Sequence, residues 1–368
     1  MKISFKNLFF VLASIIALAI ILHYAKDVLI PLCFAVLFAF ILYPVVKWMS
    51  QKGLNKILSI TLSIIGVIII QSSVIFLFST QIIEVTGQYS NLIDKLKNAL
   101  DASTSFLNNK VQIIPDIKSK ELIEGLSTFF SDNGFLMISD TVSVTSSFFS
   151  YLVLSFIYTF LILLYSKHLT KAVSYLAAKK NRKMLRKMLK EVQQVGQKYL
   201  TGMCLLILIL GILNSLGLLI LGIEYSFLFG FLAALLAVIP YVGSAVGGLI
   251  PTLYAFVTYD SYWYPIGVIA IFIFIQFLEG NFLSPKIVGG SLKINPLFSI
   301  LSLIAGGFLW GIAGMILFLP GVAMLKVVCG YFDNLKPISI LLGHYKEENN
   351  QESYSLIKRL LNFGRSGS

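Results

Sequence analysis

The 368-residue chain has little charge and few side chains suited to bond chemistry. Only 12% of its residues are charged, about half the share of an ordinary soluble domain. Its three cysteines have no paired spacing, and none of its three histidines lies between residues 202 and 330, so a disulfide framework and a histidine-based protease site are excluded. Neither an HExxH zinc motif nor a Walker-type phosphate loop occurs. The sequence therefore predicts no enzyme, no metal site, no cofactor and no built-in ATP motor.

Apolar sequence is what the chain has in quantity, with 57% hydrophobic residues. A helix needs about 20 apolar residues to cross a bilayer. Five runs meet or approach this length before the last third of the chain, and they predict spans at Asn7–Tyr24, Val28–Val46, Ile57–Ser79, Phe148–Tyr165 and Leu200–Leu221. We therefore expect an all-α, polytopic membrane protein of about six to eight membrane segments.

Basic residues are unevenly distributed along the chain, whose formal net charge is +12. Short cytoplasmic loops retain Lys and Arg, so the cations before the first span and between the second and third predict a cytoplasmic N-terminus. Residues 167–198 carry ten cations and one acid, with apolar residues at helical spacing. They predict a basic amphipathic helix along the anionic headgroups of the cytoplasmic leaflet. A membrane partner explains this charge, and we expect no nucleic-acid binding.

These signals divide the chain into five expected parts. The mildly acidic stretch after the third span is expected on the outer side of the membrane, opposite the cytoplasm. We expect it to form one or two amphipathic helices that pack on the membrane domain or on a neighbouring subunit. The parts are a three-span bundle at 1–79, the external segment at 80–147, a fourth span with the basic helix at 148–202, a glycine-rich transport core at 203–330 and a cytoplasmic tail at 331–368.

The last third of the chain predicts broken helices. Residues 202–330 contain eighteen of the twenty-seven glycines. Ser226–Tyr259 would reach about 51 Å as one helix, whereas a break at Pro240 gives two arms that suit a re-entrant hairpin. Pro296–Val328 repeats the pattern with four central glycines. We expect two hairpins with opposed tips that line a polar route; the alternative is kinked spans with small-residue contacts.

Several of these motifs together resemble one family of bacterial membrane proteins. They are Ile239-Pro240-Tyr241-Val242-Gly243, Gly247 to Pro251, Glu279-Gly280-Asn281, Pro285-Lys286-Ile287-Val288-Gly289, Asn295-Pro296-Leu297, Gly306-Gly307, Gly311, Gly314 and Pro320. The combined pattern is similar to the autoinducer-2 exporter (AI-2E) family and extends over nearly the whole chain. The resemblance implies secondary transport, with autoinducer-2 export in some members and sodium or lithium exchange for protons in others. It also implies homo-oligomers.

Candidate residues for the substrate path follow from the breaks and from one buried acid. Glu279 ends an apolar run, and an ionisable group at membrane depth is a functional candidate because it is costly; the alternative is an interfacial residue that pairs with Lys286. Gln71, Asn214 and Gln276 are expected to make interhelical hydrogen bonds. The path residues predicted are Pro240, Tyr241, Gly243, Ser244, Gly247, Pro251, Glu279, Asn281, Pro285, Lys286, Gly306, Gly307 and Gly311.

Three functions fit this pattern. The first is a secondary exporter of a small polar metabolite or signalling molecule resembling autoinducer-2, in the bacterial inner membrane with both termini cytoplasmic. The second is a sodium (lithium)/proton antiporter that uses Glu279. The third is a membrane scaffold that does not transport. The expected partners are a small-molecule or ion substrate, anionic lipid headgroups at 167–198 and further copies of the chain.

Overall fold

The computed structural model describes residues 5–87, 149–175, 178–239, 242–289 and 292–343. Within these residues the chain is helical, apart from an isolated antiparallel bridge between Ile294 and Gly343. Six of the described helices are long and apolar enough to cross a membrane: Lys26–Gln51, Lys56–Gln81, Phe149–Tyr175, Arg182–Ile220, Trp263–Val288 and Pro296–Gly330. The expected all-α polytopic membrane protein is confirmed. The predicted external segment from residue 88 and the tail from residue 344 lie outside the described residues.

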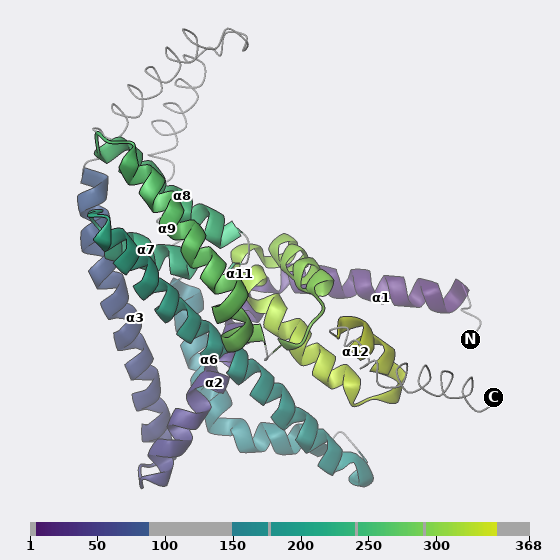
Figure 1. The fold of residues 1–368 in the computed structure, drawn as a ribbon. Helices are drawn as coiled ribbons and strands as arrows, with labels where there is room; N and C mark the ends of the chain where they lie inside the picture. The colour runs from purple at the N-terminus through teal and green to yellow at the C-terminus, as the bar shows by residue number, and fades with distance from the viewer. Residues whose placement is uncertain (1–4, 88–148, 176–177, 240–241, 290–291, 344–368) are drawn as a thin grey trace, which may run out of the picture.

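Three long helices form a bundle on one side of the molecule (Figure 1). They are α2 (Lys26–Gln51), α3 (Lys56–Gly87) and the helix Phe149–Tyr175. Their shared core joins residues such as Leu42, Ile60 and Phe156. Ser59 and Thr159 are fully buried in it, and both hydroxyls bond a carbonyl one turn back in their own helix. Small side chains of this kind let membrane helices approach closely.

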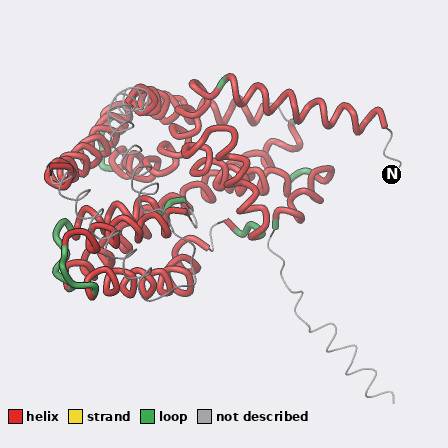
Figure 2. The backbone as a smooth tube through the Cα atoms, turned by 90° about the horizontal axis from the view of Figure 1, so that it is seen from above, coloured by secondary structure: helices red, strands yellow, loops and turns green. Residues whose placement is uncertain are grey.

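The first helix stands apart from this bundle. Helix α1 (Phe5–Tyr24) covers most of the first predicted span. It projects away from the other described helices in both views (Figures 1 and 2). Its C-terminal end is attached to the remainder of the protein through the indole of Trp310, which donates a 2.9 Å hydrogen bond to the carbonyl of Leu22.

The basic stretch 167–198 corrects one prediction. It is not a separate helix along the leaflet: its first part ends the helix Phe149–Tyr175, and its second part opens α6 (Arg182–Ile220), after a short 3₁₀ turn η1 (Lys179–Asn181). Helix α6 has 39 residues and is about 58 Å long. It continues because it contains no proline and its glycines serve as contact points. A Cβ at Gly196, for example, would press against the ring of Phe40.

The first predicted hairpin is present as α7 (Ser226–Leu236) and α8 (Val242–Thr258). The two helices pack closely, since a Cβ at Gly247 would lie 2.9 Å from the Cα of Ala233. Helix α7 has 11 residues, about 17 Å, which is too short to cross the hydrocarbon core. The chain then continues into α9 (Trp263–Leu278).

The second predicted hairpin is α11 (Pro296–Gly330), which folds back on itself at Trp310 and Gly311. Gly311 has φ 60° and ψ −140°, a conformation that essentially only glycine adopts. The two arms meet backbone to backbone, because a Cβ at Gly306 would collide with the carbonyl of Gly314. After α11 come the 3₁₀ turn η4 (Asp333–Leu335) and the short helix α12 (Lys336–Leu342).

The first hairpin lies along the C-terminal half of α6. Near its open end, Phe229 and Tyr254 pack with Leu218 in one buried cluster. Nearer the tip, Ala234 packs instead with Leu210, which lies about two turns earlier in α6. The hairpin therefore points from the C-terminal end of α6 toward its middle.

The second hairpin points the other way along the same helix. At its base, Val327 lines a pocket together with Glu191, near the start of α6. Further up the arm, Leu317 packs in one cluster with Leu200, nearer the middle of α6. The two tips thus approach the centre of α6 from opposite ends, which is the opposed arrangement expected from the sequence.

Candidate functional site

Glu279 is partly exposed and lies directly after the last residue of the apolar helix α9. The other end of α9 carries Tyr262 and Trp263, whose side chains are 69% and 77% exposed. Exposed Tyr and Trp side chains mark the interface between membrane and water. The 16 residues of α9 span about 24 Å, so in a hydrocarbon layer about 30 Å thick Glu279 lies toward the side opposite Tyr262 and Trp263.

The helix changes its winding at Glu279. Two π-helical segments follow, η2 (Glu279–Leu283) and η3 (Pro285–Gly289). Pro285 favours this change, since its ring and missing N–H do not fit a regular α-helix. The Asn281 side chain donates a 2.9 Å hydrogen bond to the carbonyl of Phe277. Wide turns of this kind are frequent at functional sites.

A small cavity lies beside Glu279, between α6, α7 and α9. It is lined by Leu210, Asn214, Ala233, Ala237, Phe272, Ile275, Gln276 and Glu279, and its volume is about 10 Å³. Gln276 and Glu279 line it together from positions one helical turn apart. A cavity of this size can hold about one water molecule when polar groups surround it.

Asn214 contributes an unpaired oxygen to this cavity. The residue is only 5% exposed, and its amide nitrogen lies 3.5 Å from the carbonyl of Gly230 in α7. Its oxygen Oδ1 is buried and has no hydrogen-bond partner. An unsatisfied buried acceptor costs about 1–3 kcal/mol, which makes Asn214 a candidate for binding a donor or a cation.

The polar lining of the cavity comes from the carboxamides of Asn214 and Gln276 and the carboxylate of Glu279. Such a set can accept a proton, coordinate a hard cation or bond the hydroxyl groups of a polar solute. Drug-sized solutes occupy pockets of about 300–1,000 Å³. A metabolite can therefore enter only when α7 or α9 moves away from α6.

The predicted path residues fall into two groups. Near the first tip, Gly243 and Ser244 lie in the first turn of α8, with Gly247 and the buried Pro251 further along it. Pro240 and Tyr241 lie outside the described residues. Asn281, Pro285 and Lys286 are exposed on the π-helical segments. The second group, Gly306, Gly307 and Gly311, lies at the other hairpin.

The segment η3 lies between the two hairpins. A Cβ at Gly202 of α6 would lie 2.7 Å from the carbonyl oxygen of Ile287, so η3 crosses α6 at the level where the tips approach each other. Sequence reasoning singled out Glu279 but assigned Asn214 and Gln276 to interhelical hydrogen bonds. One signal in the sequence could have placed Gln276 in the same site as Glu279: the two residues are one helical turn apart and therefore lie on the same face of a helix.

The comparison with known proteins identifies the family. A model of the AI-2E family transporters matches residues 8–333. The chain belongs to this family. It is 30% identical to "Putative transport protein YrrI" of Bacillus subtilis over 83% of the chain and 87% of that protein. It is also 32% identical to YueF of the same organism, over 80% of the chain and 82% of that protein.

A more distant AI-2E relative has a more specific name. The chain is 23% identical to AI-2 transport protein TqsA of Escherichia coli, over 89% of the chain and 92% of that protein. The family match and these relatives, together with six long apolar helices, support a role in membrane transport for this multi-pass membrane protein. The resemblance read from the sequence motifs is confirmed.

Proposed function

We propose that the protein is a secondary transporter that exports a small polar metabolite or signalling molecule of the autoinducer-2 kind. The observation that carries the proposal is the Glu279 cavity beside the tip of the first of two opposed hairpins. Broken helices at membrane depth are tolerated where they line a cavity, and transporters use such half-helices to hold substrate. TqsA, named as an AI-2 transport protein, supplies the substrate class.

The proposed mechanism is movement of the first hairpin relative to α6 and α9. In the present conformation the cavity of about 10 Å³ admits water only. Displacement of α7 would widen it and expose Asn214 and Glu279 to a polar solute. The second hairpin enters from the opposite end of α6 and is well placed to close the route on that side. The cavity would thus open first to one side of the membrane and then to the other, which would move solute without ATP.

The setting of the transporter is part of the proposal. The positive-inside pattern supports a bacterial inner membrane with both chain termini in the cytoplasm. The ends of the two helices that carry residues 167–198 would then contact anionic headgroups. The chain would assemble as a homo-oligomer, as the family resemblance implies.

Flux through purified protein tests the exporter. Proteoliposomes loaded with a radiolabelled polar metabolite panel, including autoinducer-2, should release one of these solutes faster than protein-free vesicles. Release should depend on an imposed ion gradient. A Lys183→Gln variant, at an exposed residue near the start of α6 that does not line the cavity, is the control and should retain most of the flux. A lack of release for every solute tested contradicts the exporter. If the protein instead binds partner proteins and shows no flux, the scaffold is favoured.

The oxygen-rich cavity favours a second candidate, a sodium or lithium/proton antiporter. Carboxylate and carboxamide oxygens suit hard cations, and Glu279 can exchange a cation for a proton. In this version, a sodium gradient should change the internal pH of proteoliposomes. Glu279→Gln should abolish the change, because it removes the titrating group while keeping the side-chain shape. If the unmodified protein gives no pH change, the antiporter is wrong.

A further inference from the structure

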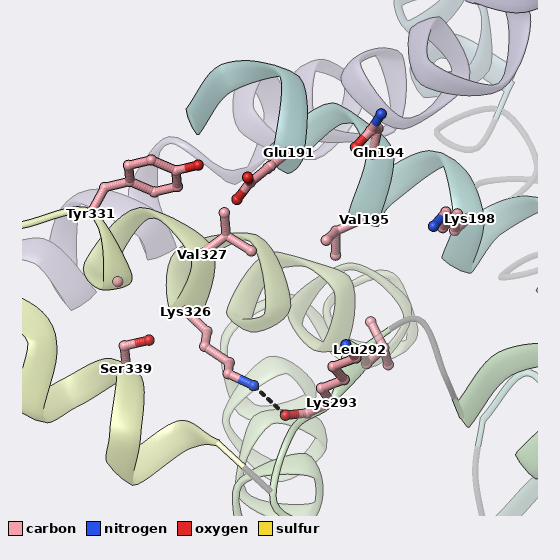
Figure 3. A pocket seen from close by; sticks show the side chains of 11 residues that line it. Glu191, Gln194, Val195, Lys198, Leu292, Lys293, Lys326, Val327, Tyr331 and Ser339 are labelled. Atoms are coloured by element: carbon pink, nitrogen blue, oxygen red, sulfur yellow. Dashed lines mark hydrogen bonds between the residues drawn. The ribbon is translucent and has the colours of Figure 1, made fainter. Parts of the chain in front are cut away.

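A second pocket, larger than the Glu279 cavity, lies at the base of the second hairpin. It has a volume of about 440 Å³, within the range of small-molecule sites. Four segments build it: the first half of α6, residues 292–293 before α11, the C-terminal end of α11, and α12 (Figure 3). Its lining residues are Glu191, Gln194, Val195, Lys198, Leu292, Lys293, Lys326, Val327, Gly330, Tyr331 and Ser339.

Positive charge dominates this pocket. Lys198, Lys293 and Lys326 line it, against the single carboxylate of Glu191. That carboxylate lies beside the hydroxyl of Tyr331 in Figure 3. The lining therefore has an excess of two positive charges. The transport route proposed above uses none of these residues.

The lysines are held in place by the backbone. The ammonium of Lys326 donates a hydrogen bond to the carbonyl of Lys293, as the dashed line in Figure 3 marks. Lys293 itself has φ 49°, a left-handed conformation that is uncommon for a residue with a side chain. An ordinary surface loop does not need this conformation, and it brings the Lys293 carbonyl to Lys326 at the pocket wall.

Neutral donors complete the lining. Desolvation and the neighbouring Glu191 carboxylate raise the pKa of Tyr331 to about 12, and its hydroxyl is a donor at neutral pH. The hydroxyl of Ser339 faces the pocket from α12 (Figure 3). Lysine ammonium groups together with hydroxyl donors suit a phosphate group, which offers several strong acceptor oxygens and negative charge.

We infer that this pocket binds a phosphate-bearing anion and thereby joins the base of the second hairpin to α6. The phosphate can belong to a free metabolite or to a lipid headgroup, since both present the same oxygens. A bound anion would offset the repulsion between Lys293 and Lys326 and link α12 to α6 and α11. Binding is therefore expected to stabilise the closed base of the hairpin.

Binding to purified protein tests the inference. Inorganic pyrophosphate is titrated calorimetrically into protein in an uncharged detergent, and thermal unfolding is followed with and without it. The lipid source is tested by the same unfolding measurement in nanodiscs of phosphatidylglycerol and of phosphatidylcholine. Lys198→Gln and Lys293→Asn each remove one charge, and asparagine tolerates the left-handed backbone at 293. Lys183→Gln is the matched control, because Lys183 is an exposed cation on the same helix outside the pocket.

Each pocket variant should weaken pyrophosphate binding by about tenfold, as expected for one charge-assisted hydrogen bond, while Lys183→Gln leaves it unchanged. Stabilisation by phosphatidylglycerol alone, lost in the same two variants, assigns the site to a headgroup. The inference is overturned if neither probe acts or if the control weakens binding as much as the pocket variants. Glu279→Gln should leave binding intact, so a failure of the transport proposal leaves this test standing.

Discussion

The two hairpins of the C-terminal third reverse the chain by different means. In the first, five residues around Pro240 separate α7 from α8. In the second, α11 reverses at Trp310 and Gly311, and the positive φ of Gly311 makes the turn possible. The backbone of Ala237, Val238 and Ile239 still bonds back to α7, so the first reversal extends over five residues, whereas the glycine break confines the second to two.

The hairpins also differ in what lies at their tips. Beside the first is the cavity with Asn214, Gln276 and Glu279. At the second, Trp310 bonds the carbonyl of Leu22 in α1 and meets the ring of Phe318 edge to face, with centroids 5.5 Å apart. The polar groups are thus gathered at one tip, while the other is attached to the N-terminal helices. This contrast supports the proposal that the first hairpin contacts solute while the second is anchored.

The backbone contact at Gly306 and Gly314 offers the strongest way to break the second hairpin. Gly306→Ala or Gly314→Ala puts a Cβ into the carbonyl of the opposite arm. Each is expected to destabilise the protein by about 3 kcal/mol, because backbone cannot move aside as a side chain can. Unfolding in sodium dodecyl sulfate, followed by tryptophan fluorescence, measures the loss.

A matched control exists in the same element. A Cβ at Gly321, also in α11, would have no atom within 4 Å. Gly321→Ala should therefore leave stability unchanged or raise it by up to about 1 kcal/mol, the difference in helix propensity. Equal losses in Gly306→Ala and Gly321→Ala would show that the two arms do not meet as described.

The turn itself is the next most sensitive position. Gly311→Ala meets no neighbour within 4 Å, so any cost is conformational. We expect a loss of about 2 kcal/mol, since the φ and ψ at this position are strained for every residue with a side chain. The same unfolding assay measures it. An unchanged midpoint would mean that the reversal does not depend on this residue, and the contrast with the proline break would lose its basis.

Parts of this architecture follow from local sequence. Pro240 and the run Gly306, Gly307 and Gly311 predict breaks, because proline and glycine act on the backbone wherever they occur. The second hairpin turns beside the predicted glycines, and the first has its two arms on either side of Pro240. Glu279 was singled out for a similar reason, since the cost of a charge in an apolar run is a local property.

Other parts depend on partners that are distant in sequence. Gly196 and Gly202 look like interruptions of α6, yet they lie against Phe40 and Ile287 within a continuous helix. The same residue type breaks one helix and packs in another, and only the neighbours decide between the two. The meeting of Asn214 with Glu279 likewise requires the fold of α6 against α9.

The anchor of the second hairpin is expected to have a smaller effect than its turn. Trp310→Phe removes the hydrogen bond to the carbonyl of Leu22 and keeps an aromatic ring against Phe318. The expected loss is about 1 kcal/mol, the net value of one hydrogen bond, measured as a shift in the unfolding midpoint. Trp263→Phe, at an exposed indole, is the control. Equal shifts in the two variants would remove the anchoring role from Trp310.

The smallest effect on stability, and the sharpest test of the contrast, is expected at Asn214. Asn214→Leu removes a buried oxygen without a partner and gives up only a 3.5 Å contact to Gly230. Leucine has a similar size and no unmet hydrogen-bonding group, so stability should stay within about 0.5 kcal/mol of the original protein or rise. Flux in proteoliposomes should nevertheless fall at least tenfold, because the polar group of a cavity-lining residue is lost. Buried groups kept at a cost to stability are typical of functional sites. A variant that is more stable and transports at the normal rate would make Asn214 a packing residue. The polar groups beside the first hairpin would then no longer distinguish it functionally from the second.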